Sequence, residues 1–99
     1  MNKKRTRLEV IKDILEVIKS RNGKIKPTHI LYKSNLSYAM MEGYLAELKE
    51  KGFIVELEAE GHRKGKNGNS KSYKITDKGI EYLNKYSLVA NFTESFGLD

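Results

Sequence analysis

The sequence predicts a single, mostly helical α+β domain with a three-helix core, a β-hairpin and a C-terminal helix. Apolar residues recur at helical spacing up to about residue 51, alternate with polar residues over residues 55–60 and 71–75, and return to helical spacing after residue 76. A long loop rich in Gly, Asn and Lys separates the two alternating segments. With 99 residues, of which 38% are hydrophobic, the chain builds one small core, which favours a binding module over an enzyme with a large buried pocket.

The first helix is predicted over residues 7–19. Its apolar stripe consists of Leu8, Ile11, Leu15 and Ile18. Thr6 and Glu9 form a capping box, in which each side chain accepts a hydrogen bond from a free backbone N–H of the other residue. Gly23 ends the helix because it tolerates the left-handed backbone conformation. Residues 24–25 then form a short edge strand.

Two further helices follow, joined by a tight turn. Pro27 at a first helical position opens a short helix that ends at Lys33. Residues 34–36 form the turn, and Ser37 caps a third helix that ends at residues 51–52. This pair is a helix-turn-helix. Helical spacing directs one set of side chains of the third helix to the core, namely Met41, Tyr44, Leu45 and Leu48, and another set outward, namely Tyr38, Met40, Glu42 and Gly43.

The alternating segments predict two antiparallel strands. In the first, the side chains that point to one face are Val55, Leu57 and Ala59, and those that point to the other are Glu56, Glu58 and Glu60. The second strand covers residues 71–75. We expect the three glutamates to share a face with Ser72 and Lys74, which predicts cross-strand pairs of opposite charge.

Thr76 is predicted to cap a fourth helix, whose apolar stripe includes Ile80 and Leu83. The complete order is helix, short strand, helix, turn, helix, strand, long basic loop, strand, helix. This is the order of the winged helix fold, in which the hairpin is the wing. We assign residues 1–86 to a winged helix domain with a basic N-terminal arm, and residues 87–99 to a C-terminal tail.

The C-terminal tail predicts self-association. The last helix and the tail carry the apolar residues Leu83, Tyr86, Leu88, Val89, Phe92 and Phe96. A domain this small cannot bury all of them, so we expect a homodimer through the C-terminal helix and tail. The alternative is that the tail folds back on the first helix.

Several strings also resemble a known family. "NLSY" at the start of the third helix, "YLAELKEKGFI" at its end and "YKITDKGIEYL" over residues 73–83 are similar to archaeal winged-helix regulators. "KKRTRLEVIKDILE" resembles their basic and then amphipathic opening. The greatest similarity is to the small dimeric chromatin proteins of that group, over roughly residues 3–86. The resemblance implies a cytoplasmic, nucleoid-associated protein that binds double-stranded DNA, either a transcriptional regulator or a chromatin protein.

Two features depart from that family. The wing loop is longer than expected for the chromatin proteins. The chain also ends soon after the predicted fourth helix, where those proteins continue into a long dimerising coiled coil.

The positive charge is concentrated. The chain has a net charge of +6, and residues 1–7 and 61–74 together hold nine basic side chains and no acidic one. Because nine exceeds the net charge, the rest of the chain has more acidic than basic residues. Such concentration suits contact with a polyanion and predicts duplex DNA as the partner. The alternative is that both stretches are a solvated tail and a solvated loop.

In a winged helix the start of the third helix enters the major groove, while flanking cations hold phosphates. We expect Ser37 and Tyr38 to contact bases or backbone, and Met40 to press on a thymine methyl. Glu42 counts against deep insertion, and Tyr38 with Met40 could instead form a small exposed apolar patch. The full predicted DNA-binding set is Lys3, Lys4, Arg5, Lys33, Ser34, Asn35, Ser37, Tyr38, Met40, Arg63, Lys64, Lys66 and Lys71.

Other functional classes find little support in the sequence. There is no cysteine, and His29 and His62 lack the spacing of metal ligands, so we expect no enzyme, no metal and no cofactor. The glycines around Lys66 do not have the spacing of a nucleotide-binding loop. No apolar run is long enough for a membrane span. The remaining alternative is a winged helix that binds proteins or RNA.

Overall fold

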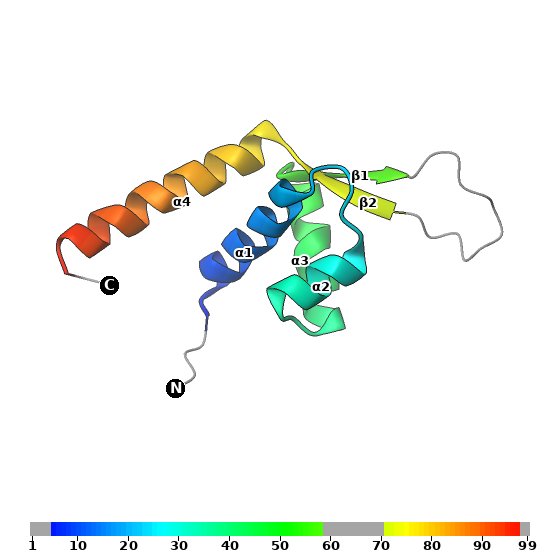
Figure 1. Cartoon of the computed structure of the whole chain (residues 1–99), viewed down its shortest axis with the longest axis horizontal. Coiled ribbons are helices and arrows are strands. Elements are labelled where there is room, and N and C mark those ends of the chain that lie inside the picture. The colour runs from blue at the N-terminus through cyan, green and yellow to red at the C-terminus, as the bar shows by residue number, and fades with distance from the viewer. Residues whose placement is uncertain (1–4, 59–70, 98–99) are drawn as a thin grey trace.

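The computed structural model describes residues 5–58 and 71–97. Its elements, in chain order, are α1 (Arg7–Ser20), α2 (Pro27–Ser34), α3 (Tyr38–Glu50), β1 (Ile54–Glu58), β2 (Lys71–Ile75) and α4 (Asp77–Ser95). Figure 1 shows α1, α2 and α3 gathered beneath the hairpin, with α4 projecting to the side opposite the wing. The predicted mostly helical α+β class and the winged helix order are therefore confirmed.

The core lies between the three helices and the hairpin. The predicted capping box at Thr6 and Glu9 is present and fixes the start of α1. From there α1 turns Ile14, Leu15 and Ile18 fully inward, because residues at this spacing share one helical face. The other elements complete the core with Ile25, Ile30, Met41, Leu45, Leu48, Ile54, Tyr73, Ile75 and Leu83.

The helix-turn-helix forms as predicted, with one shift. Pro27 occupies the start of α2 and Ser37 caps α3, its Oγ accepting a hydrogen bond from the N–H of Met40 at 3.2 Å. The turn begins one residue later than predicted, because Ser34 is the last residue of α2. Asn35 ends the helix with a left-handed backbone (φ 55°), a conformation that asparagine tolerates better than most residues.

The alternation within the first strand is as predicted, with Val55 and Leu57 on one face and Glu56 on the other, but the residues predicted to share a face across the hairpin are wrong. Ile54 is buried and pairs with Ile75, so the face toward the core carries Ile54 and Glu56, and the opposite face carries Val55 and Leu57. The glutamates of the strand consequently share a face with Lys71 and not with Ser72 and Lys74. Ala59 and Glu60 lie outside the described residues.

The predicted edge strand at residues 24–25 is reduced to a single antiparallel bridge between Ile25 and Tyr73. Additional bonds hold the preceding loop against the free edge of β2. The N–H of Gly23 donates to the Tyr73 carbonyl at 3.0 Å, and the N–H of Ile75 donates to Asn22 Oδ1 at 2.8 Å. The loop between α1 and α2 thus takes the place of a third strand.

The fourth helix is longer than predicted. It begins at the Thr76 cap and continues through residues 87–95, so the described part of the predicted tail is a helix. Its first half packs on α1, where the Tyr82 hydroxyl donates to the Leu8 carbonyl at 3.0 Å. Its second half does not fold back on α1, because its large apolar side chains stay 60% to 67% exposed, namely Leu88, Val89, Phe92 and, just after the helix, Phe96. No helix of the described residues combines the length and apolarity that crossing a membrane requires.

Candidate nucleic-acid interface

A hollow of about 320 Å³ lies where the start of α2, the start of α3 and the second wing strand meet. We call it the front hollow. Its lining includes Tyr38 and Lys71, which the sequence predicted as site residues, and Lys26 and Thr28, which it did not. Three elements far apart in the chain therefore present polar, aromatic and basic side chains to one place.

The outer face of α3 carries small side chains along its middle, with Glu42 exposed beside them. Tyr38 is 64% exposed and Met40 47% exposed, as predicted. Between them the helix turns outward the small residues Ala39, Gly43 and Ala46. Among the described residues, nothing lies within 4 Å of the place a Cβ would take on Gly43. The helix can thus approach a partner closely, with Tyr38 at one border and Met40 at the other.

Two carboxylates lie close to these side chains: Glu42 lines the front hollow, and Glu56 lines the adjoining hollow between α3 and the hairpin. A hydrogen bond with Glu42 raises the pKa of the Tyr38 hydroxyl, so the phenol stays neutral far above neutral pH. Glu56 accepts a hydrogen bond from Lys49 at 2.8 Å, and this bond, with the Lys71 ammonium 3.7 Å away, holds the Glu56 pKa below its usual value. Glu56 is thereby paired with two lysines, which reduces its repulsion of an approaching anion.

The start of α2 adds a backbone donor to the front hollow. Within the described residues, no side chain caps this helix end. Pro27 has no N–H and the N–H of His29 donates to the Lys26 carbonyl, so the N–H of Thr28 and the positive end of the helix dipole are what favour an anion, with the exposed Lys26 side chain beside them. A phosphate group fits this chemistry.

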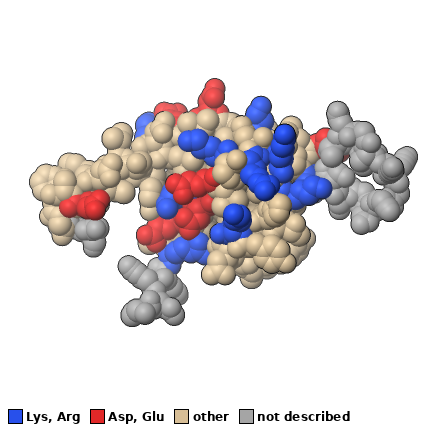
Figure 2. Space-filling view, viewed as in Figure 1, with Lys and Arg blue, Asp and Glu red and all other residues tan. Residues whose placement is uncertain are grey.

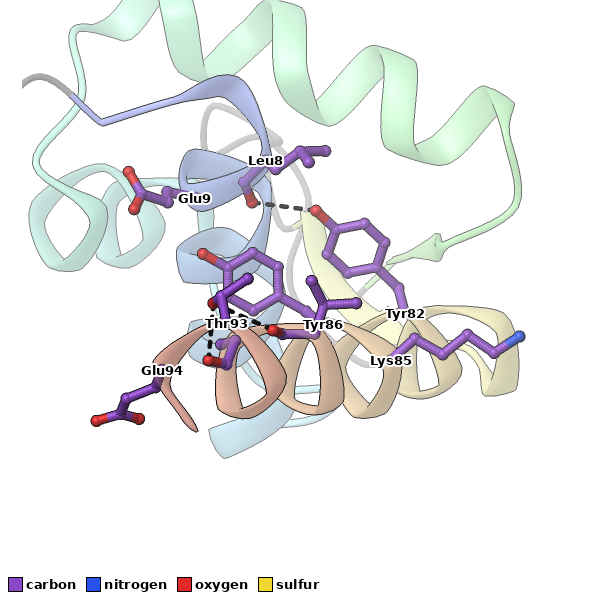
Figure 3. Close-up of a pocket in the computed structure, with 9 residues that line it drawn as sticks. Leu8, Glu9, Tyr82, Lys85, Tyr86, Thr93 and Glu94 are labelled. Atoms are coloured by element: carbon purple, nitrogen blue, oxygen red, sulfur yellow. Dashed lines mark hydrogen bonds between the residues drawn. The ribbon is translucent and has the colours of Figure 1, made fainter. Parts of the chain in front are cut away.

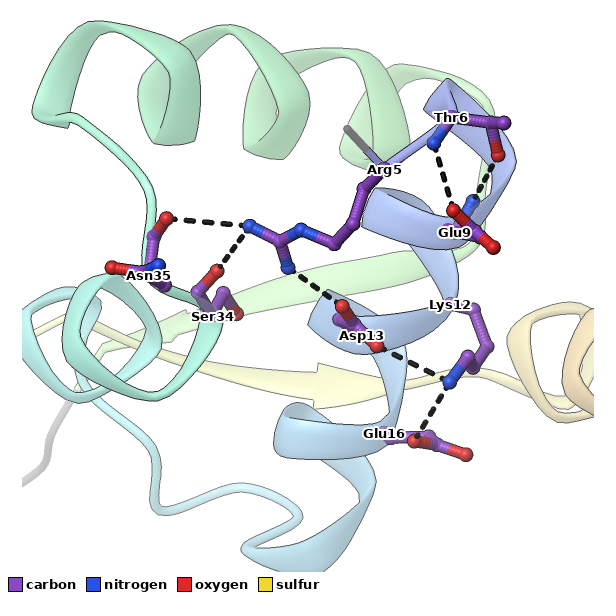
Figure 4. Close-up of polar contacts among 8 residues, drawn as sticks. All are labelled: Arg5, Thr6, Glu9, Lys12, Asp13, Glu16, Ser34 and Asn35. Atoms are coloured by element: carbon purple, nitrogen blue, oxygen red, sulfur yellow. Dashed lines mark hydrogen bonds and ion pairs between the residues drawn. The ribbon is translucent and has the colours of Figure 1, made fainter. Parts of the chain in front are cut away.

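Arg5, a predicted DNA contact, is bound within the fold (Figure 4). Its Nη1 donates to Asp13 Oδ2 at 2.6 Å, and its Nη2 donates to the carbonyl oxygens of Ser34 at 2.8 Å and Asn35 at 3.3 Å. The guanidinium therefore satisfies carbonyls at the C-terminal end of α2 and ties the arm to the helix-turn-helix.

The remaining predicted residues divide into three groups. Ser34 is 1% exposed, so the prediction that its side chain contacts DNA is wrong. The side chain of Ser34 faces the core because Ser34 belongs to α2 and not to the turn. Lys33 and Asn35 are exposed at the end of α2, and Ser37 is exposed while its Oγ caps α3. Outside the described residues lie Lys3, Lys4, Arg63, Lys64 and Lys66.

The sequence analysis missed a third basic stretch. Between Glu16 and Glu42 the chain has no acidic residue. The five cations of this stretch are all exposed: Lys19, Arg21, Lys24, Lys26 and Lys33. Figure 2 shows Lys and Arg gathered over the loop that joins α1 to α2 and beside the hairpin. The signal was present as an acid-free interval, but its cations are more widely spaced than those of the arm and the wing loop.

A second hollow, of about 510 Å³, lies between the start of α1 and the second half of α4 (Figure 3). Its walls are mainly apolar and include Leu8, Tyr82, Tyr86 and Val89. Leu8 is 56% exposed although the helical spacing assigned it to the apolar stripe of α1. We call this the α4 groove. Among the described residues there is no group of His, Asp or Glu side chains that could hold a metal ion, there or elsewhere.

Comparison with known proteins agrees with this architecture. A family model described as winged helix-turn-helix matches residues 4–94. The crystal structure of Sso10a-2, a DNA-binding protein from Sulfolobus solfataricus, is similar to this chain with a TM-score of 0.68 and 22% sequence identity, over 93% of this chain and 85% of that chain. At that identity the likeness shows the fold. The comparison with curated protein sequences gave no match.

Proposed function

Since the chain belongs to the winged helix-turn-helix family, we propose that it binds duplex DNA, with the start of α3 in the major groove. The wing and the start of α2 then lie on the flanking phosphates. The observation that carries the proposal is the front hollow, where Lys26, Tyr38 and Lys71 come together from three elements. Sso10a-2, with a similar fold, is described as DNA-binding, which supports the assignment.

The chemistry of α3 favours binding dominated by the DNA backbone. Its outer face offers Tyr38, Met40, Glu42 and small residues, and no Arg or Gln that could form a bidentate pair with a base edge. The cations stand around the helix rather than on its reading face. We therefore propose a modest sequence preference, in a protein of the nucleoid that acts as a chromatin protein or a transcriptional regulator.

We further propose that the protein acts as a homodimer joined through α4. The exposed apolar side chains of the second half of α4 adjoin the α4 groove, and together they form a long apolar strip on one protomer. A two-fold dimer would cover it and place two front hollows on one assembly.

Fluorescence anisotropy with labelled duplex at several salt concentrations tests DNA binding. If about six cations meet phosphates, the slope of log affinity against log salt is about −5. The double variant Lys26→Ala with Lys71→Ala should make the slope shallower by about two units, while Lys85→Ala, a cation paired with Glu81 on α4, should leave it unchanged. A slope near zero, or tighter binding to single-stranded RNA than to duplex, would contradict the proposal.

Replacing Tyr38 separates base contacts from phosphate contacts. Tyr38→Ala should leave the salt slope nearly unchanged and cost about 1 to 3 kcal/mol on a preferred site, with a smaller loss on random duplex. Equal binding of parent and variant to both duplexes would show that α3 is not the reading element.

A further inference from the structure

The described cations fall into two groups according to their partners. The ion pairs of the described residues use Arg5, Arg7, Lys12, Lys49, Lys51, Lys71 and Lys85. In contrast, no cation of residues 17–41 forms an ion pair with another described residue, and neither does Lys74 on β2. Of these unpaired cations, the front hollow uses Lys26. The others need a separate explanation.

Three of the unpaired cations gather at the rear of the hairpin. Ser72 Oγ donates to the Gly23 carbonyl at 3.2 Å, and the N–H of Ile75 donates to Asn22 Oδ1 at 2.8 Å, so the loop that carries Lys24 lies against β2 on both sides of Lys74. Arg21 ends α1 just before this loop. The loop also reaches over the hairpin, since Leu57 Cδ1 lies 3.9 Å from the place a Cβ would take on Gly23. We call Arg21, Lys24 and Lys74 the rear basic surface.

The rear basic surface and the front hollow lie on opposite faces of the hairpin. Lys71 and Tyr73 face α3, where they line a hollow with Leu45 and Ala46. Lys74 is on the other face, because successive side chains of a strand alternate. Val55 and Leu57 on that face are 41% and 36% exposed, so the face is open to solvent.

The placement of these cations is unfavourable for the isolated protein. The three side chains carry the same charge, and no described carboxylate pairs with Lys24 or Lys74 to offset their mutual repulsion. A polyanion removes that repulsion. Lysine and arginine side chains suit a phosphate backbone, whereas unpaired bases are bound by aromatic side chains on which they stack.

We propose that the rear basic surface binds the phosphate backbone of a second duplex segment, while the front hollow holds the first. The proposal rests on the proposed function of the front hollow. A duplex seated on α3 and the front of the wing lies across the hairpin from Lys74, so the rear contact requires another segment. Binding there is independent of sequence, because point cations read phosphates and not base edges.

A capture assay tests the proposal. One duplex is fixed on beads, the full chain is added, and a second, labelled duplex is recovered after washing. The variant Arg21→Ala, Lys24→Ala, Lys74→Ala should capture about tenfold less labelled duplex than the parent, while its affinity for a single duplex in solution falls less than about threefold. The control Lys12→Ala, Lys51→Ala, Lys85→Ala removes the same formal charge from ion-paired lysines and should capture as the parent does.

Three results would overturn the proposal: a parent that binds one duplex but captures no second one, a rear variant that captures as much as the parent, or an equal loss in the control. A dimer with two front hollows could also capture a second duplex, but the rear variant would then keep that capture. Failure of the parent to bind any single duplex is a distinct result, which removes the proposed function itself. Binding to phosphatidylglycerol vesicles that the rear variant loses, without capture of duplex, would assign the surface to membranes instead.

Discussion

Charged side chains near the surface hold α1 against the helix-turn-helix. Arg5 connects α1 to the end of α2, and Arg7 connects it to α3 through Glu47 and the ring of Tyr44, 5.8 Å from the guanidinium carbon. Both arginines belong to the basic arm in the sequence, where they look like DNA contacts. Their acceptors are 8 to 40 residues away along the chain, so the pattern of the sequence could not reveal them.

Replacing Arg5 should weaken the fold. Arg5→Ala removes charge-assisted hydrogen bonds to Asp13 and to two carbonyls at the end of α2, and we expect the free energy of unfolding to fall by about 1 to 2 kcal/mol. Arg5→Lys should recover only part, because an ammonium does not match the forked geometry. Urea denaturation, with Lys85→Ala as a control, measures the change. Unchanged stability together with weaker DNA binding would restore Arg5 as a DNA contact.

Glu47 should make stability depend on acid. Hydrogen bonds from Arg7 and Lys51 hold the Glu47 pKa below its ordinary value of 4.5. A carboxylate with a lowered pKa stabilises the folded state above the unfolded-state pKa, and this contribution is lost as the pH falls through the folded-state pKa. Parent and Glu47→Gln should therefore differ in unfolding free energy at pH 7 and converge below about pH 4. Denaturation curves of the parent and the variant at pH 7 and below about pH 4 measure this difference in unfolding free energy. A difference that does not change with pH would show that the ion pair contributes nothing to stability.

At the scale of elements, helices followed from the sequence better than strands. Caps such as Thr6, Ser37 and Thr76 are local signals, and all three act as predicted. Which side chains share a face of the hairpin depends on one residue of register, and the glutamates lie on the face of Lys71 and not, as predicted, on that of Ser72 and Lys74. The sequence analysis ended α4 too early. The apolar residues at the end of this helix do not pack against the rest of the chain, so their pattern resembles that of an irregular tail.

Two glycines in helices should respond in opposite ways to alanine. At Gly79 of α4 a Cβ would lie 2.6 Å from both Ile75 Cγ1 and the Phe53 carbonyl oxygen, so Gly79→Ala should destabilise by about 1 to 3 kcal/mol despite the better helix propensity. Gly43 of α3 faces open space among the described residues, so Gly43→Ala should stabilise by about 0.5 to 1 kcal/mol. Thermal unfolding of both variants checks the pair. Stabilisation at Gly79 would mean that the close approach of α4 to the wing is wrong.

The same Gly43 variant also informs on function. If α3 enters a groove along its face of small residues, an added methyl group at Gly43 should weaken DNA binding even though it stabilises the fold. Opposite signs in the two measurements would separate a binding effect from a folding effect. If the Gly43→Ala variant binds DNA as tightly as the parent or more tightly, α3 does not lie in the DNA interface.

At the scale of the whole molecule, the composition predicted one small domain with a basic surface for a partner. It did not predict which cations form ion pairs within the protein and which do not. Among the described residues, ion pairs engage Arg5 and Arg7 of the arm, Lys49 of α3 and Lys85 of α4, while the cations of the loop between α1 and α2 form none. That division depends on which acids come near in space. The apolar residues of α4, by contrast, could be recognised in the sequence, because they are more numerous than one small core can bury. We therefore expect α4 to form a dimer interface.

Replacing Phe92 should dissociate the protein into protomers. Phe92 is 60% exposed in the middle of the apolar strip of α4, and a buried charge at a two-fold interface would be unpaired in both protomers. Light scattering should give a dimer for the parent and a monomer for Phe92→Glu at tens of micromolar protein, while Ser87→Glu, which adds the same charge at an exposed position on another side of α4, should stay dimeric. The monomer should also bind a duplex with two sites more weakly than the parent, because linked sites raise the effective concentration. A parent that is monomeric both free and on DNA would mean that the strip has another partner.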